Sequence, residues 1–240
     1  PTRPSSDLTG GEPLWRLWGG RGDPIPTYGS GCYRGLGREG MIAKAERYVA
    51  EGFGAIKMQV AHLFTPEEDV ANVAAMRAAL GPEVAIMVDV NQGWDAETAI
   101  ATGRALAPSA PFWLEEPVRC DDFEGTDRVA AALPYPVATG ENNWAPEDHA
   151  PILAAGRVPY LQPDVMRGGF TGLLDLAREA EAAGARLCPH LFPELMCHVL
   201  AAIPNGGWLE YMGWFDALWS EPLIPSGGTL TPPERPGHGM

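Results

Sequence analysis

The chain has 240 residues, with 17 lysines and arginines against 31 aspartates and glutamates, so its formal net charge is −14. A content of 45% hydrophobic and 20% charged residues is typical of a folded globular protein, and the length suits one large domain. An acidic chain is poorly suited to nucleic acid, which requires clustered lysine and arginine, and no apolar run is long enough to span a membrane. Four scattered cysteines without a CxxC pattern predict reduced thiols, so we expect a cytoplasmic protein.

Short apolar runs alternate with longer amphipathic stretches along the whole chain. The runs that predict strands are 25–29, 55–60, 84–90, 111–114, 136–139, 160–162, 185–188 and 207–210. The stretches with apolar residues at helical spacing are 38–51, 66–80, 96–106, 122–133, 146–155, 170–183 and 193–202. This alternation predicts a parallel sheet with helices outside it, and about eight strands in this length favour an α/β fold of the TIM-barrel type. An open, doubly wound sheet is the alternative.

Three of the predicted strands end in an acidic residue, namely Asp89, Glu115 and Glu141, which recur at intervals of 26 residues. One strand–helix unit of a barrel has about that length, so these carboxylates should share one level at the carboxyl ends of the strands, where barrel active sites lie. Three carboxylates in one place repel each other unless a cation neutralises them, and oxygen ligands suit Mg²⁺ or Mn²⁺ rather than zinc. The alternative is that they are exposed loop acids or helix N-caps.

The other strand ends also carry polar residues. Asp164 and His190 end successive predicted strands, where the carboxylate could orient the imidazole and raise its basicity for work as a general base. Glu210 ends the last strand. Lys57 and Gln59 lie at the end of the second strand and face the same predicted mouth.

Together these strand ends resemble the enolase superfamily, in particular its mandelate racemase-like branch (the mandelate racemase/muconate lactonizing enzyme family). The resemblance covers nearly the whole chain and depends on several motifs occurring in one order. The matching stretches are Asp89-Val-Asn91-Gln-Gly-Trp94, Trp113-Leu-Glu115-Glu116-Pro, Gly140-Glu141-Asn142, Gln162-Pro-Asp164, Pro189-His190 and Trp208-Leu-Glu210.

The resemblance implies a modified (β/α)7β barrel with Mg²⁺ held by Asp89, Glu115 and Glu141. It also implies an Asp164–His190 acid/base pair, and Glu210 as a hydrogen-bond or electrostatic partner of the substrate carboxylate. The shared step of the family is removal of the proton α to a carboxylate to give an enediolate that the metal stabilises.

The resemblance also implies how the domains are arranged. Residues 1–22 are interpreted as a remnant that links to an absent N-terminal α+β capping domain, with residues 23–240 as the barrel. The barrel is expected to be truncated at its C-terminal return segment, and the chain opens with Pro1 rather than Met, so we expect a longer parent protein. In the family the cap closes the mouth and contacts the distal end of the substrate. The full-length parent is expected to be a homo-oligomer.

One departure from the family pattern bears on the reaction. Racemases of this branch carry Lys-x-Lys at the second strand, whereas this chain has Lys57-Met-Gln59, and an amide cannot act as a second base. Dehydration of a sugar acid (an aldonate or aldarate) can proceed with one base and is therefore favoured. Gln59 and Asn91 are predicted to bind substrate, Lys57 to support its carboxylate, and His62 to be either a second acid or a surface histidine.

Two other functions stay open. The chain could be a racemase, epimerase or cycloisomerase of the same superfamily. It could also be a catalytically incompetent barrel that only binds metal and small acids. In each case the predicted partner is a small carboxylate, with no nucleic acid and no membrane.

Overall fold

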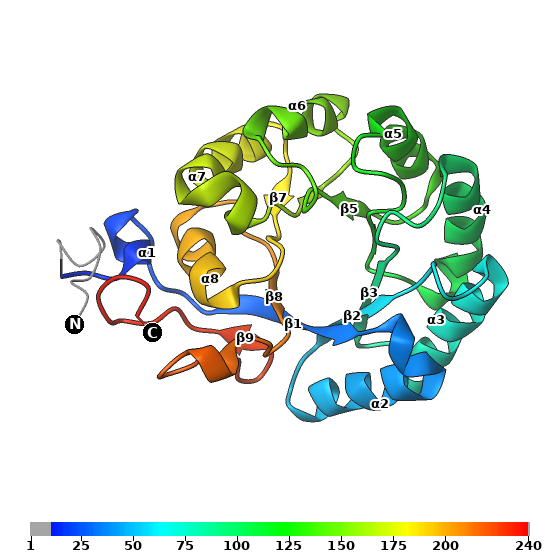
Figure 1. The fold of residues 1–240 in the computed structure, drawn as a ribbon, viewed down its shortest axis with the longest axis horizontal. Helices are drawn as coiled ribbons and strands as arrows, with labels where there is room; N and C mark the ends of the chain where they lie inside the picture. The colour runs from blue at the N-terminus through cyan, green and yellow to red at the C-terminus, as the bar shows by residue number, and fades with distance from the viewer. Residues whose placement is uncertain (1–10, 240) are drawn as a thin grey trace.

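Eight parallel strands form a closed ring with helices outside it in the computed structural model, which describes residues 11–239 (Figure 1). The strands are β1 (Ile25–Cys32), β2 (Ala55–Gln59), β3 (Ala85–Asp89), β4 (Trp113–Glu115), β5 (Val137–Thr139), β6 (Tyr160–Leu161), β7 (Arg186–Leu187) and β8 (Leu209–Tyr211). They are hydrogen-bonded in the order β7-β6-β5-β4-β3-β2-β1-β8. The ring closes where Leu187 of β7 hydrogen-bonds the backbone of Asn205 and Gly207, at 3.0 and 2.8 Å, just before β8. The predicted barrel is confirmed, and the open sheet is excluded.

The helices that surround the ring agree closely with the predicted ranges. They are α2 (Gly37–Ala50), α3 (Pro66–Leu80), α4 (Ala96–Leu106), α5 (Phe123–Ala132), α6 (Pro146–Ala155), α7 (Val165–Ala182) and α8 (Pro193–Ala202). At the start of α3 the side chain of Thr65 accepts from the backbone N–H of Glu68, and the Glu68 carboxylate accepts from the N–H of Thr65 at 2.8 Å. This reciprocal capping box is encoded locally, which explains why the predicted bounds are correct.

Helix α7 is interrupted just before residue 170, where the predicted helix begins. Gly169 has a φ of 63° and a ψ of 171°, a non-helical conformation that glycine adopts without steric cost, so the predicted start at residue 170 is confirmed for the longer segment. The helical turn before this kink, from Val165, was not predicted. Asp164 caps it by accepting from the Met166 N–H at 2.7 Å, so a helical turn starts directly at the strand end that carries Asp164.

Alternation along the strands separates two apolar regions. Side chains such as Ile56, Val88 and Leu161 point outward into the large core between sheet and helices. Tyr28, Met87, Trp113 and others form a smaller cluster inside the barrel, where the ring centroids of Trp113 and Tyr160 lie 5.2 Å apart. Because these bulky side chains fill the interior of the barrel, the polar side chains of the strand ends gather at its carboxyl-end mouth.

Several elements were not predicted. Helix α1 (Leu14–Leu17) lies beside α8, and β9 (Thr229–Leu230) pairs antiparallel with β1 (Figure 1). Three short 3₁₀ turns cover Arg34–Leu36, Ala107–Ser109 and Asp216–Leu218. Part of the predicted linking segment 1–22 is therefore helical, while its residues 1–10 lie outside the described residues.

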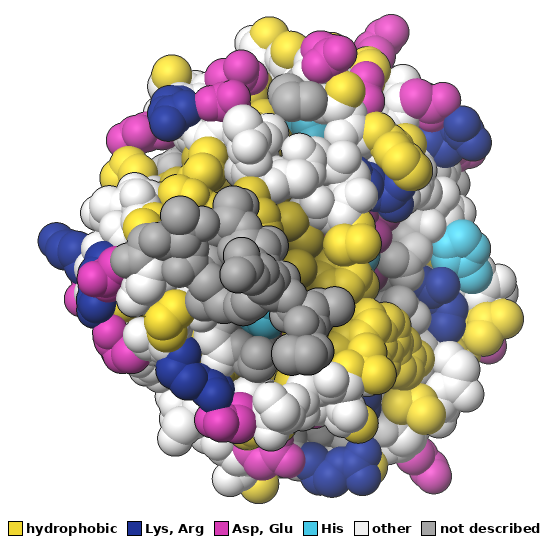
Figure 2. Space-filling view, turned by 60° about the vertical axis from the view of Figure 1, so that its left-hand side comes forward, with side chains coloured by type: hydrophobic (Ala, Val, Ile, Leu, Met, Phe, Trp, Pro, Cys, Tyr) yellow, Lys and Arg dark blue, Asp and Glu magenta, His cyan; other side chains and the backbone are white. Residues whose placement is uncertain are grey.

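Charged side chains lie mainly around the outline of the face drawn in Figure 2, and hydrophobic side chains gather nearer its middle. Cys32, Cys120, Cys188 and Cys197 are free thiols, as predicted. Within residues 11–239, no helix has both the length and the hydropathy needed to cross a membrane.

Candidate active site

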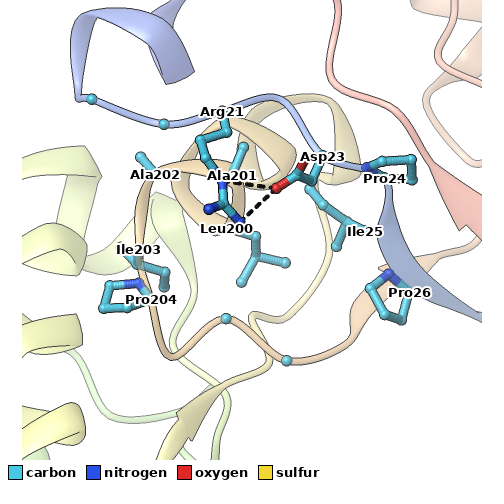
Figure 3. Close-up of a pocket in the computed structure, with 14 residues that line it drawn as sticks. Arg21, Asp23, Pro24, Ile25, Pro26, Leu200, Ala201, Ala202, Ile203 and Pro204 are labelled. Atoms are coloured by element: carbon cyan, nitrogen blue, oxygen red, sulfur yellow. Dashed lines mark hydrogen bonds and ion pairs between the residues drawn. The ribbon is translucent and has the colours of Figure 1, made fainter.

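A cavity of about 100 Å³ opens at the carboxyl ends of the strands and contains most of the predicted site residues. Its lining residues are Ser30, Gly31, Tyr33, Lys57, Gln59, Asp89, Asn91, Glu141, His190, Leu191, Glu210, Met212 and Trp214. A larger cavity of about 520 Å³ lies between residues 19–26 and 200–207, beside the Arg21–Asp23 ion pair (Figure 3). This cavity lies at the start of β1 and before β8, and its lining includes no predicted site residue. The smaller cavity is therefore the candidate site.

The three predicted metal ligands lie on neighbouring strand ends. Asp89 and Glu115 are register partners on β3 and β4, and Glu141 follows β5. Asp89 accepts from the backbone and side-chain N–H groups of Asn91, at 2.8 Å each. In the part of the chain that the structure describes, no three His, Cys, Asp or Glu side chains surround a common point closely enough to hold an ion. The acids are neighbours, but Asp89 and Glu115 are bonded to protein donors, and Glu141 Oε2 lies 3.7 Å from the imidazole of His190.

These carboxylates nevertheless have the chemistry of a site for a hard divalent cation. Burial raises the pKa of Asp89 to about 6, with a contribution from the charge of Glu141. Burial and the charges of neighbouring acids also raise the pKa values of Glu115 and Glu141, despite the opposing charge of Lys57. Buried carboxylates that destabilise one another's charge fit Mg²⁺, whose charge would relieve the repulsion.

The predicted acid/base pair is formed. His190 Nδ1 lies 2.8 Å from Asp164 Oδ2, and the other Asp164 oxygen is occupied by the Met166 N–H. With Nδ1–H directed at the carboxylate, Nε2 faces the cavity and lies 3.7 Å from Glu141 Oε2. Burial lowers the pKa of His190, but the bond to Asp164 and the charge of Glu141 outweigh it and raise the pKa to about 9. The imidazole is thus oriented and strongly basic.

Lys57 lies at the centre of a buried ion-pair cluster. Its ammonium contacts Glu115, and its Nζ lies 2.9 Å from Glu210 Oε1, with both carboxylates fully buried. Although burial opposes ionisation, Lys57 and His190 lower the pKa of Glu210 to about 2. Glu210 also accepts from the backbone N–H of Leu191 at 2.9 Å. The predicted catalytic residues Lys57 and Glu210 are therefore direct partners of each other.

The predicted substrate-binding residues differ in their positions. Gln59 and Asn91 line the cavity. His62 is exposed, does not line the cavity, and contacts the backbone oxygen of Asn91 through Nε2 at 3.0 Å. Of the two histidines near the mouth, only His190 faces the cavity.

Other residues of the site were missed by the sequence analysis. The Trp113 indole N–H donates to Glu115 at 2.9 Å, a contact that strand alternation could have indicated because Trp113 lies two residues before Glu115. Arg34, which follows β1, donates to the side chain of Asn91, which follows β3, and no local signal could have found this contact. Glu116 is also buried, but both of its carboxylate oxygens accept from Asn142, at 2.8 and 3.0 Å. Glu115 likewise has a protein partner at each carboxylate oxygen, Lys57 and Trp113, so Glu115 stays the predicted ligand on the motif alone.

Comparisons with known proteins agree with this arrangement. Residues 40–240 match the enolase C-terminal domain-like family. The chain is 37% identical to 3,6-anhydro-alpha-L-galactonate cycloisomerase of Streptomyces coelicolor, over 95% of this chain and 63% of that protein. It is 35% identical to L-talarate/galactarate dehydratase of Salmonella typhimurium, over 96% of this chain and 58% of that protein. The chain therefore spans less than two thirds of the length of both relatives.

Solved structures include similar barrels with bound metal. A racemase from Streptomyces coelicolor with bound magnesium has a TM-score of 0.92 at 35% identity, over 97% of this chain and 65% of that one. L-talarate dehydratase from Polaromonas, complexed with Mg and L-glucarate, has a TM-score of 0.91 at 34% identity, over 97% and 66% of the two chains. Magnesium binding is thus a property of these neighbours.

Proposed function

Because this chain belongs to the enolase C-terminal domain-like family, we propose that it is the barrel of a Mg²⁺-dependent enzyme that dehydrates a sugar acid. The observation that carries the proposal is the Asp164–His190 pair, in which Nε2 of His190 opens on the cavity that Lys57 and Gln59 also line. His190 is thus an oriented base that shares a cavity with the buried ammonium of Lys57 and with several acids. This arrangement is suited to removing a proton α to a carboxylate.

His190 carries the proton transfers in this proposal. Asp164 holds Nδ1–H, so the neutral form of His190 accepts the α-proton of the substrate at Nε2. The raised pKa makes this form the minor one at neutral pH, and the charge of a divalent cation on the neighbouring acids would favour it. The C–H electron pair then forms the carbon–carbon double bond as the β-hydroxyl leaves, and the proton on Nε2 joins that hydroxyl to release water. The net reaction is loss of one water molecule from the acid, with no oxidant or reductant.

The remaining residues bind and orient the substrate. Lys57, held between Glu115 and Glu210, presents a fixed positive charge to the substrate carboxylate. Asp89, Glu115 and Glu141 would hold Mg²⁺, with Mn²⁺ as a substitute. A divalent ion there supplies charge that stabilises the negative charge developing on the carboxylate. Gln59 donates hydrogen bonds but cannot take a proton, which restricts proton transfer to one face.

Proton exchange at the α-carbon tests the proposal directly. The 240-residue chain is incubated with Mg²⁺ and candidate aldonates and aldarates in D₂O, and deuterium incorporation and loss of water are followed by NMR. We expect exchange from one face only, without inversion. His190→Asn should abolish both reactions, Asp164→Asn should slow them less, and His62→Asn, the control at an exposed histidine, should leave them unchanged. Exchange that persists in His190→Asn would overturn the assignment.

The same experiment distinguishes the other candidate functions. A cycloisomerase is supported by the 37% identical relative of that activity, and its product would keep every atom of the substrate, whereas a dehydratase product loses water. Efficient inversion at the α-carbon would indicate an epimerase with a second base. Binding of Mg²⁺ and acids without any exchange would indicate a barrel that is catalytically incompetent by itself.

A further inference from the structure

Two aromatic side chains form one wall of the candidate active site. Tyr33 follows β1 and Trp214 follows β8, two strands that are hydrogen-bonded neighbours in the ring. The two rings are stacked, with centroids 5.7 Å apart and planes inclined by 17°. Both line the same cavity as His190 and Gln59. We call Tyr33 and Trp214 the aromatic wall.

The wall is supported on several sides. The Tyr33 hydroxyl donates to Met212 Sδ at 3.2 Å, and Lys44 Nζ lies 5.0 Å from the centroid of the Tyr33 ring. Phe215 meets Trp214 edge-on, with centroids 6.5 Å apart. Trp214 is nevertheless 53% exposed, although indole is one of the largest apolar groups in proteins. A supported aromatic ring that stays half exposed beside a cavity is available to pack against a ligand.

Few of the groups that line the cavity could pair with a second carboxylate. The described lining contains the acids Asp89, Glu141 and Glu210, and its two cationic groups are already paired: Lys57 with Glu115 and Glu210, and His190 with Asp164. Lys44, which packs against the Tyr33 ring, is not a lining residue. Among the described lining residues, the cavity therefore offers no unpaired cation to a second carboxylate.

The chemistry of aromatic rings indicates what would bind there. The face of an indole ring carries partial negative charge, which attracts the polarised C–H groups of a polyol and repels a carboxylate. We propose that the aromatic wall is a subsite for the uncharged distal carbons of a monocarboxylic sugar acid, so that the site prefers aldonates over aldarates. This inference rests on the proposed function, because it places the reacting carboxylate at Lys57.

Matched acids that differ only at the distal carbon test the subsite. Gluconate is compared with glucarate, and galactonate with galactarate, by calorimetric titration of the 240-residue chain in the presence of Mg²⁺. We expect the better-bound monoacid to bind at least about tenfold more tightly than its diacid. Trp214→Ala should weaken the binding of that monoacid by about tenfold, which is the order expected for loss of one aromatic contact. The affinity for the diacid should change little.

Trp144→Ala is the matched control, because Trp144 is 64% exposed but does not line the cavity. The Trp144→Ala variant should bind both acids with the same affinity as the unaltered chain. Equal or tighter binding of the diacid would overturn the subsite, as would equal losses in the Trp214 and Trp144 variants. If no acid binds, both the subsite and the proposed function fail. If the preference is present but no α-proton exchanges, only the proposed function fails.

Discussion

His198 is a fully buried histidine on α8 that should make the stability of the fold depend on pH. Its Nδ1 accepts from the backbone N–H of Trp15 at 3.3 Å, and its Nε2 lies 3.1 Å from the backbone oxygen of His238. A backbone N–H can only donate and a carbonyl can only accept, so both contacts require a neutral imidazole with its proton on Nε2. The side chain thereby joins two segments that are far apart in the sequence.

The sign and size of the effect follow from the pKa of His198, which burial lowers from 6.5 to about 4. At a pH between these two pKa values, His198 is protonated in the unfolded chain but not in the folded chain, so the unfolding free energy rises with pH across this range. The contribution is fully present above about pH 6.5 and is lost as the pH falls toward 4. At about 1.4 kcal/mol per pKa unit, the swing is on the order of 3 kcal/mol.

Urea unfolding between pH 4.5 and 7.5 measures this contribution. His198→Gln should be less stable than the unaltered chain at pH 7.5, because the fit of the imidazole between its two partners is lost. The difference in unfolding free energy should shrink by about 2 to 3 kcal/mol at pH 4.5. His62→Gln, at an exposed histidine, controls for removal of an imidazole. A difference for His198→Gln that does not change with pH would refute the reasoning.

Three further perturbations test local features of the fold and the site. Thr65→Ala removes the capping box of α3 and should lower the unfolding free energy, measured by urea unfolding, by about 1 kcal/mol. No change would mean that the cap does not contribute to stability. Arg77 donates to the backbone oxygens of Gly81, Val84 and Ser109, and Arg77→Met removes this donor. The unfolding free energy should fall by about 2 kcal/mol in the same assay, whereas a change near zero would show that water replaces the guanidinium. Glu115→Gln should weaken Mg²⁺ binding at least about tenfold in calorimetry, compared with no change for the exposed Glu97→Gln; equal affinities would remove Glu115 from the predicted ligand set.

The predictions that the structure matches best depend on information carried locally. The bounds of α3 are correct because its cap, first-turn proline and terminal glycine are consecutive with the helix. The level of the strand-end residues was predictable because each strand–helix unit has nearly constant length, so Asp89 and Glu115 become register partners. The Asp164–His190 contact follows in the same way from two successive strand ends.

The sequence by itself therefore determined the barrel, the family and the set of polar side chains at its mouth. Only the tertiary structure decided how those side chains pair: Lys57 between Glu115 and Glu210, and Trp214 against Tyr33. It also decided that His198 joins the segments at Trp15 and His238. Closing the ring brings β8 beside β1, and distances across a closed barrel depend on shear and packing rather than on spacing along the chain.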